Sequence, residues 1–428
     1  MQGKSGVAAT LQTLVSKLLI LAVNVATGII TARVLGPEGR GEQAAISMWP
    51  SLLAYSLTFG LPAALLYNLK RYPEEKTELF SASLVLGTGL SLMATIIGVV
   101  FIPLWLVKYS PEVIFYAQLL MLTAPLALLG VTFSAALEAS DDFTRANQLY
   151  FFPPLCTLFA LVVLALLGKL TALTSALSYM LSGVPIFIWT FVRLWRLFQP
   201  RWTGLAASFK RLLNFGLRSY GIDLLSTLGS QIGDVLIVGL LAPELMGLYT
   251  VAVSVSRMLS VLESSIATVL FPKAAARPVQ EVVALTGRAA RVSLVITLLV
   301  GLAVMVIGPF LLQLLYGSKY MGAVPVFRIL IIEVVLGGAT AILAQAFMAL
   351  GRPSIVTILQ AVGLGMSVPL MLILIPKFGL VGVGLAVLGS TTARLISVIV
   401  SYQLVLKVQP PRLLFTWDDW NFIKQKFQ

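Results

Sequence analysis

Long apolar stretches follow one another along almost the whole chain, separated by short polar gaps. A helix that crosses a membrane needs about 20 mostly apolar residues, and twelve stretches reach this length. The pattern therefore predicts an all-α, polytopic membrane protein. Its transmembrane helices are expected at residues 11–35, 43–69, 79–107, 112–137, 146–168, 172–195, 216–241, 245–272, 286–315, 322–349, 354–375 and 379–406.

The distribution of Lys and Arg predicts how these helices are oriented. Cytoplasmic loops of membrane proteins are enriched in positive charge. With the N-terminus inside, the cytoplasmic segments hold twenty Lys and Arg residues and the opposite segments hold seven. Because a miscount by one helix would destroy this alternation, the bias also supports the number twelve. We expect both termini in the cytoplasm.

A short motif recurs at about half the chain length. The sequence LGPEGRG at residues 35–41 returns as LAPELMG at 241–247, with Leu, Pro, Glu and Gly conserved at an offset of 206 residues. Six helices per half is an even number, so both halves enter the membrane from the same side, as in parallel-repeat transporters. The predicted divisions are a six-helix bundle at 1–199, an interfacial linker helix at 200–215, a second six-helix bundle at 216–406 and an amphipathic tail at 407–428.

Composition supports lipid as the main solvent and excludes several kinds of site. Of the 428 residues, 58% are hydrophobic and 11% charged, whereas a soluble domain carries about 25% charged residues. The net charge of +13 does not indicate a nucleic-acid partner, because the cations lie in short gaps and not on one basic face. Histidine is absent and Cys156 is the only cysteine, so no Cys/His metal site is expected. Cys156 lies in an apolar stretch and is predicted to be buried.

Charged residues inside the predicted spans are the candidates for function. An ionised side chain at the centre of a bilayer costs roughly 2.5–3.5 kcal/mol on insertion scales, so it normally faces protein or a water-filled cavity. Several of these charges lie on polar helical stripes, such as Asp223 with Asp234. Such stripes also mediate plain helix packing, and Lys17 is close enough to a helix end to snorkel. The candidates are Lys17, Asp223, Asp234, Arg257, Glu263, Glu333 and Arg394.

The chain resembles the polysaccharide-transporter branch of the multidrug, oligosaccharidyl-lipid and polysaccharide exporter superfamily, whose members are repeat-unit flippases for O-antigen and exopolysaccharide. The motifs that carry the resemblance are spread over essentially the whole chain. They are ARVLGPEGRG at 32–41, FGLP at 59–62, GDVLIVG at 233–239, GLYTVA at 247–252, LFPK at 270–273, LYG at 315–317 and ALGRP at 349–353.

The resemblance implies two six-helix bundles around a central cavity lined mainly by the first, second, seventh and eighth helices. It implies a substrate, an oligosaccharide on a polyprenyl pyrophosphate, moved from the cytoplasmic to the outer leaflet of a bacterial or archaeal cell membrane by alternating access. A monomer that works with a polysaccharide polymerase and chain-length machinery is expected, without enzymatic activity of its own.

The resemblance also suggests roles for single residues. Arg257 matches a position on the eighth helix that is commonly basic, while Lys17 and Arg33 match more loosely. Guanidinium groups grip pyrophosphate with paired hydrogen bonds, and hydroxyl and amide groups suit sugars. We therefore expect substrate binding by Arg257, Lys17, Asn24, Arg33, Tyr55 and Arg394. No cofactor is expected, but coupling to H⁺ or Na⁺ would fall to Asp223, Asp234, Glu263 or Glu333, since there is no histidine.

Three alternatives remain open from the sequence. A multidrug antiporter of the same superfamily would have a cavity dominated by acids, whereas acids and bases are mixed here. A lipid II flippase would have fourteen helices instead of twelve. A glycan polymerase or ligase would carry a long outer loop with catalytic groups, and the predicted outer loops are short.

Overall fold

The structure is a computed structural model that describes residues 2–261, 263, 264, 266, 270, 274 and 277–413, without the side chains of residues 2–18, 143, 144 and 222. The described residues form helices and connecting loops, with no strand among them. In the first half these are α1 (Gln2–Ser56), α2 (Leu61–Arg71), η1 (Pro73–Glu75), α3 (Lys76–Trp105), α4 (Pro111–Leu120), η2 (Met121–Thr123), α5 (Ala124–Ala139), α6 (Phe143–Leu166), α7 (Ala172–Leu181) and α8 (Val184–Phe198). In the second half they are α9 (Leu205–Leu240), α10 (Pro243–Ser256), η3 (Arg257–Leu259), α12 (Val279–Tyr316), η4 (Ser318–Ala323), α13 (Val324–Ala349) and α14 (Pro353–Leu404).

Among the described residues, nine helical segments are long and apolar enough to cross a membrane. Two of them lie in helices that are interrupted by a glycine outside the helical conformation. Gly36 in α1 has φ 70° and Gly379 in α14 has φ 56°, a left-handed region that glycine adopts without steric cost. Each of these helices therefore supplies two of the predicted spans. The remaining prediction, 245–272, falls where α10 and η3 lie and the described residues are interrupted.

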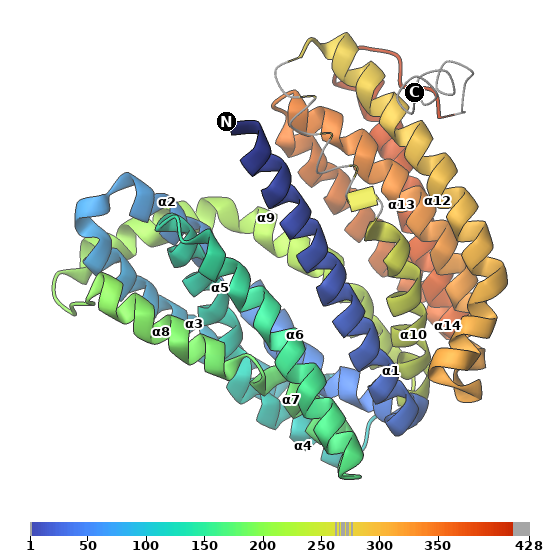
Figure 1. The fold of residues 1–428 in the computed structure, drawn as a ribbon, viewed down its shortest axis with the longest axis horizontal. Coiled ribbons are helices and arrows are strands. Elements are labelled where there is room, and N and C mark those ends of the chain that lie inside the picture. Colours follow the sequence, from blue (N-terminus) through green and yellow to red (C-terminus); the bar gives the residue numbers. More distant parts are fainter. Residues whose placement is uncertain are drawn as a thin grey trace. The chain divides into compact units, whose positions relative to one another are not determined.

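The chain divides into two compact units. Unit 1 comprises Met1–Leu228 with Ala242–Gly247, and unit 2 comprises Gly229–Leu241 with Leu248–Gln428. In unit 2, α13 packs against both α12 and α14, and the three helices run side by side in Figure 1. Their shared core includes the fully buried Ile342, Phe347 and Tyr402. The hydroxyl of Tyr402 donates to the carbonyl of Leu343 at 2.8 Å, so its polar atom is satisfied inside the apolar core.

The motif repeat makes a reciprocal contact inside unit 1. A Cβ atom on Gly41 would lie 1.7 Å from the carbonyl oxygen of Pro243, and one on Gly247 would lie 1.8 Å from the carbonyl oxygen of Pro37. Gly41 and Gly247 are equivalent positions of the two motif copies, and so are Pro37 and Pro243. Each copy thus places its proline carbonyl where only the glycine of the other copy fits. This contact explains why Ala242–Gly247 belongs to unit 1 although its flanking residues do not.

The segment predicted as a separate linker helix differs in the structure. Helix α9 begins at Leu205 and continues without interruption through the predicted seventh span to Leu240. Its first turns are held within unit 1: the rings of Phe215 and Tyr67 stack at 4.3 Å, and Tyr220 donates to the carbonyl of Ser56. These contacts fix the start of α9 to α2 and to the end of α1. The amphipathic tail predicted at 407–428 lies outside the described residues from residue 414 onward.

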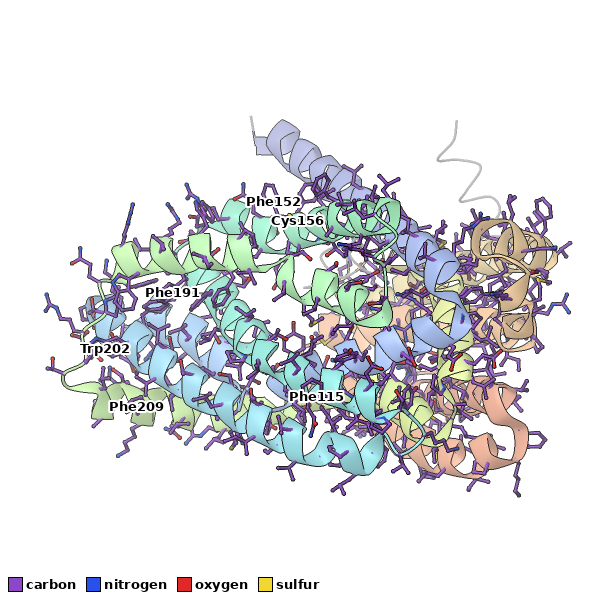
Figure 2. The ribbon with its side chains drawn as sticks, turned by 90° about the horizontal axis from the view of Figure 1, so that it is seen from below. Phe115, Phe152, Cys156, Phe191, Trp202 and Phe209 are labelled. Atoms are coloured by element: carbon purple, nitrogen blue, oxygen red, sulfur yellow. The ribbon has the colours of Figure 1, made fainter. Side chains whose placement is uncertain are left out.

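The prediction that Cys156 is buried is wrong. Its side chain is exposed on α6. Phe152, one turn away on the same helix, is exposed too, at 42%. Figure 2 shows the two residues next to each other on the same helix. Exposed apolar side chains are normal on a transmembrane helix because lipid covers them. The apolar surroundings of Cys156 in the sequence therefore indicated lipid rather than a protein core.

Ion pairs gather at one end of unit 1. Lys70 Nζ lies 2.6 Å from Asp141, and Asp142 accepts from Arg145 at 2.5 Å and from Arg193 at 2.9 Å. The five pairing residues come from α2, α6 and α8 and from the turn before α6. The Lys/Arg bias predicts that Lys70, Arg145 and Arg193 all lie on the cytoplasmic side of the membrane. The structure brings these three cations together.

Asp142 is the more buried of the two acids in these ion pairs, and we expect removal of its charge to lower the stability of the protein measurably. Burial raises the pKa of Asp142, but hydrogen bonds from Arg145 and Arg193 more than offset this, so the pKa lies below its ordinary value. The stabilisation is complete above the pKa of an unfolded aspartate, about 3.9, and is lost as the pH falls through the lower folded-state value. Asp142→Asn should lower the free energy of unfolding by about 1 kcal/mol at neutral pH.

Thermal unfolding of the purified protein in detergent between pH 3 and 7 would measure this effect. Asp141→Asn is the matched control, because Asp141 is 71% exposed and an asparagine tolerates its φ of 58°. Equal unfolding midpoints for the two variants across this pH range would contradict the assignment.

Candidate functional site: a charge cluster in unit 2

The predicted site residues of unit 1 are spread along two helices. Asn24 and Arg33 are exposed on α1, Tyr55 is half-buried near its end, and Asp223 is half-buried on α9. The side chain of Lys17 lies outside the described residues. These positions stay predictions, since the described contacts do not gather them into one site.

The five remaining predicted charges meet in unit 2. They come from four different parts of the chain: α9, the segment from η3 to residue 263, α13 and α14. Arg257 interacts electrostatically with Asp234 and with Glu333. Glu333 also interacts with Glu263 and with Arg394. We refer to Asp234, Arg257, Glu263, Glu333 and Arg394 as the charge cluster.

Glu333 lies at the centre of the cluster. Its Oε1 accepts a hydrogen bond of 2.7 Å from Thr391 Oγ1. A Cβ atom on Gly337, one turn along α13, would lie 3.5 Å from this oxygen and 4.0 Å from Arg394 Nη2. The bare backbone at Gly337 therefore leaves room for the carboxylate and the guanidinium on the same side of α13. Glu333 and Arg394 are both half-buried, and their opposite charges interact.

The carboxyl group of Glu263 packs closely against Gly338, the residue that follows Gly337 in α13. A Cβ atom on Gly338 would lie 1.9 Å from the carboxyl carbon of Glu263. The carboxyl group therefore rests on the backbone of Gly338, and the residue is only 7% exposed. Its Oε1 is buried and finds no hydrogen-bond partner among the described residues. A buried carboxyl without a partner is costly, and such groups concentrate at functional sites.

Arg257 is the exposed member of the cluster. It lies at the start of η3 with its side chain exposed, within electrostatic range of Asp234 and Glu333. Tyr249, which is 5% exposed, interacts with the same three charges. The charges of Asp234 and Glu333 thus act on Arg257 while its side chain stays exposed. An exposed guanidinium is suited to bind an oxyanion such as a phosphate.

Sequence reasoning missed Thr391 and Tyr249. Thr391 lies three residues before Arg394, on the same face of α14, and this spacing was the signal that could have identified it. The pair Gly337 and Gly338 was also a signal, because adjacent glycines inside a predicted helix indicate close approach of another group.

The two neighbouring glycines allow a matched test of how Glu263 is placed. Gly338→Ala should displace the Glu263 carboxyl and lower the free energy of unfolding by about 1–3 kcal/mol, the usual cost of overpacking. Gly337→Ala meets only ordinary contacts, since its nearest neighbour lies at 3.5 Å, and should be close to neutral. In a double-mutant cycle with Glu263→Ala, the cost of Gly338→Ala should largely vanish. Additive effects in that cycle would show that Glu263 does not rest on Gly338.

Comparisons with known proteins agree on the class of the chain. A family model for polysaccharide biosynthesis proteins matches residues 30–325. No curated protein matches the chain. Among solved structures, an inward-facing multidrug resistance MATE transporter of the MOP superfamily is similar with a TM-score of 0.73 and 17% identity, covering 92% of this chain and 98% of that chain.

Two further structures share the fold. The lipid II flippase MurJ in an inward closed conformation has a TM-score of 0.74 and 14% identity, covering 92% of this chain and 87% of that chain. A MOP superfamily transporter from Pyrococcus furiosus, described as having a binding pocket of reverse polarity, has a TM-score of 0.61 and 16% identity, covering 92% and 93%. The family match spans well over half of the chain, so the protein is a member of the polysaccharide biosynthesis protein family, a multi-pass membrane protein with the fold of the MOP-superfamily transporters.

Proposed function

We propose that the protein is a flippase that moves an oligosaccharide linked to polyprenyl pyrophosphate from the cytoplasmic to the outer leaflet of the cell membrane. The observation that carries this proposal is Arg257, an exposed guanidinium on a predicted membrane span, beside Asp234 and Glu333. An arginine exposed to hydrocarbon would be costly, so its surroundings are expected to be water or an anionic ligand. Family membership supports a glycan as the cargo.

The pyrophosphate is the part of this substrate that the cluster can recognise. Its oxygens compete with Asp234 and Glu333 for the guanidinium of Arg257, and Arg gives two parallel hydrogen bonds to such a group. Glu333 keeps Thr391 and the nearby Arg394 as partners when Arg257 turns to the ligand. Asp234 has Arg257 as the cation acting on it, so ligand binding leaves it in need of another positive charge.

This exchange suggests how transport is coupled to an ion. When the pyrophosphate takes Arg257, uptake of H⁺ or Na⁺ at Asp234 restores the local charge balance. Release of the substrate returns Arg257 to Asp234 and expels the ion. Glu263, which is buried without a hydrogen-bond partner among the described residues, is a second place for the proton. If the ion is H⁺, a carboxyl O–H bond forms on uptake and breaks on release, and no other covalent bond changes in this cycle.

Reconstitution in liposomes tests the proposal. A fluorescent polyprenyl-pyrophosphate oligosaccharide is placed in both leaflets, and the fraction accessible to an external reagent is followed with time. Liposomes that contain the protein should make nearly all of the label accessible, whereas empty liposomes should expose about half. If the protein moves an organic cation and leaves the glycolipid in place, the antiporter alternative holds. Rescue of cells depleted of their lipid II flippase would favour that alternative substrate.

A further inference from the structure

A second basic site lies in unit 2, away from the charge cluster, where α12 begins and the chain leaves α14. We call residues 405–413 the C-terminal strap. The strap and the first turns of α12 line an open cavity of about 380 Å³. Gln280, Arg288 and Arg291 line it from α12, and Val408, Gln409 and Pro411 line it from the strap. Its volume lies within the range of small-molecule sites.

The strap is held over α12 by specific contacts. Arg291 Nη1 donates to the carbonyl of Arg412 at 3.0 Å, and Arg352 Nη1 donates to the carbonyl of Val405 at 2.6 Å. A Cβ atom on Gly287 would lie 2.4 Å from Pro411 Cβ, so the bare backbone of α12 receives the proline ring. The cavity is therefore built by packed and hydrogen-bonded groups on both sides.

The lining of the cavity is cationic. Two guanidinium groups and two side-chain amides face it, and none of the described residues that line it is acidic. The cavity also lies beside the N-terminal turns of α12, the end at which the helix dipole is positive. These features together select a ligand that carries negative charge on oxygen atoms.

The position of the cavity relative to the membrane indicates the source of such a ligand. The Lys/Arg bias predicts that the start of α12 and the end of α14 lie on the cytoplasmic side of the membrane, where anionic lipids concentrate. Exposed Leu404 precedes the strap with 74% of its surface accessible, which is expected of a residue at the lipid boundary. Basic pockets between helices at this level are suited to lipid headgroups.

We propose that this cavity binds the phosphate group of an anionic phospholipid headgroup, with Arg288 and Arg291 as the charged ligands and Gln280 and Gln409 as hydrogen-bond donors. The bound headgroup bridges α12 and the strap, and so fastens the end of α14 to α12. This site is separate from the proposed transport site and does not depend on it.

Lipid binding to the purified full chain tests the proposal. The protein in a neutral detergent is titrated with phosphatidylglycerol, with phosphatidylcholine and with inorganic phosphate, and its unfolding midpoint and bound lipid (by native mass spectrometry) are recorded. Phosphatidylglycerol should raise the midpoint and remain bound, whereas phosphatidylcholine should do neither. Each arginine near a membrane surface contributes roughly fivefold in affinity, so Arg288→Gln should weaken phosphatidylglycerol binding about fivefold.

Matched variants keep the test independent of folding. Gln280→Glu places a negative charge in the cavity without touching the bond between Arg291 and Arg412, and should weaken binding further than Arg288→Gln. Arg277→Gln, which removes a cation from the same segment but outside the cavity, should bind lipid as the unaltered protein does. Competition by millimolar inorganic phosphate would support the site and assign it to a soluble phosphate compound. Equal phosphatidylglycerol affinity for Gln280→Glu, Arg288→Gln and Arg277→Gln would overturn the proposal.

Discussion

Arg257→Ala should reduce glycan export at least 30-fold while the protein still inserts into the membrane. A hydrogen bond to a charged group contributes about 1.5–3 kcal/mol, and a bidentate grip on pyrophosphate involves two of them, which corresponds to roughly 100-fold or more in binding. Arg257→Lys keeps the charge but loses the planar fork, so it should retain part of the activity. Surface glycan per cell, divided by the amount of protein in the membrane fraction, measures the effect.

Two controls separate binding from folding in this experiment. Arg277→Ala removes an exposed cation that pairs with Glu281, and should leave export unchanged. The double variant Arg257→Ala with Asp234→Asn removes the acid that would otherwise be left facing no cation, and should restore stability without restoring export. A normal glycan yield from Arg257→Ala would remove this residue from the substrate site.

The largest structural effect is expected at the reciprocal contact of the motif repeat. Gly41→Ala and Gly247→Ala each place a methyl group less than 2 Å from a backbone carbonyl, which cannot yield as a flexible side chain does. The two backbones must separate, and we expect each change to lower the free energy of unfolding by about 3 kcal/mol, at the upper end for overpacking. The double variant should yield little folded protein.

The chain offers a matched control for each of these glycines. Gly28 lies in α1 as Gly41 does, and Gly229 lies in α9, and neither has any atom within 4 Å of an added Cβ. Gly28→Ala and Gly229→Ala should be neutral or stabilising, because alanine is favoured over glycine in a helix by about 1 kcal/mol. Unfolding midpoints and yields in one detergent compare all four variants. If Gly41→Ala unfolds at the same temperature as Gly28→Ala, the contact does not constrain the fold.

Hydropathy predicts the positions of most helices because lipid imposes a simple length requirement. The stretch 79–107 corresponds to α3 at Lys76–Trp105, and 112–137 corresponds to α4 to α5, Pro111–Ala139. The predicted span 43–69 is broken at Phe59 and Gly60, which have φ of 45° and 71°. A Cβ atom on Gly60 would lie 2.3 Å from the carbonyl of Gly216. The Gly and Pro of the FGLP motif are a local signal for this break, whereas hydropathy alone does not show it, nor does it show the close approach of Gly216.

The candidate site shows the same division between local and distant information. Charge inside an apolar stretch singles out Asp234, Arg257, Glu333 and Arg394 one by one, because each is costly in lipid. Which of them meet depends on how α9, α13 and α14 pack, and spacing along one helix carries no information about that. The sequence therefore divided these residues between substrate binding and ion coupling, whereas the structure places both groups in a single cluster.

The reciprocal contact between the two motif copies has an evolutionary consequence. In a symmetric homodimer, residue i of one subunit meets residue j of the other while j meets i, and Pro37 with Gly247 and Gly41 with Pro243 reproduce that pattern within one polypeptide. The contact therefore has the geometry by which a half-length chain could pair with a second copy of itself. Between the matched residues the two copies differ, since Gly39 and Arg40 correspond to Leu245 and Met246.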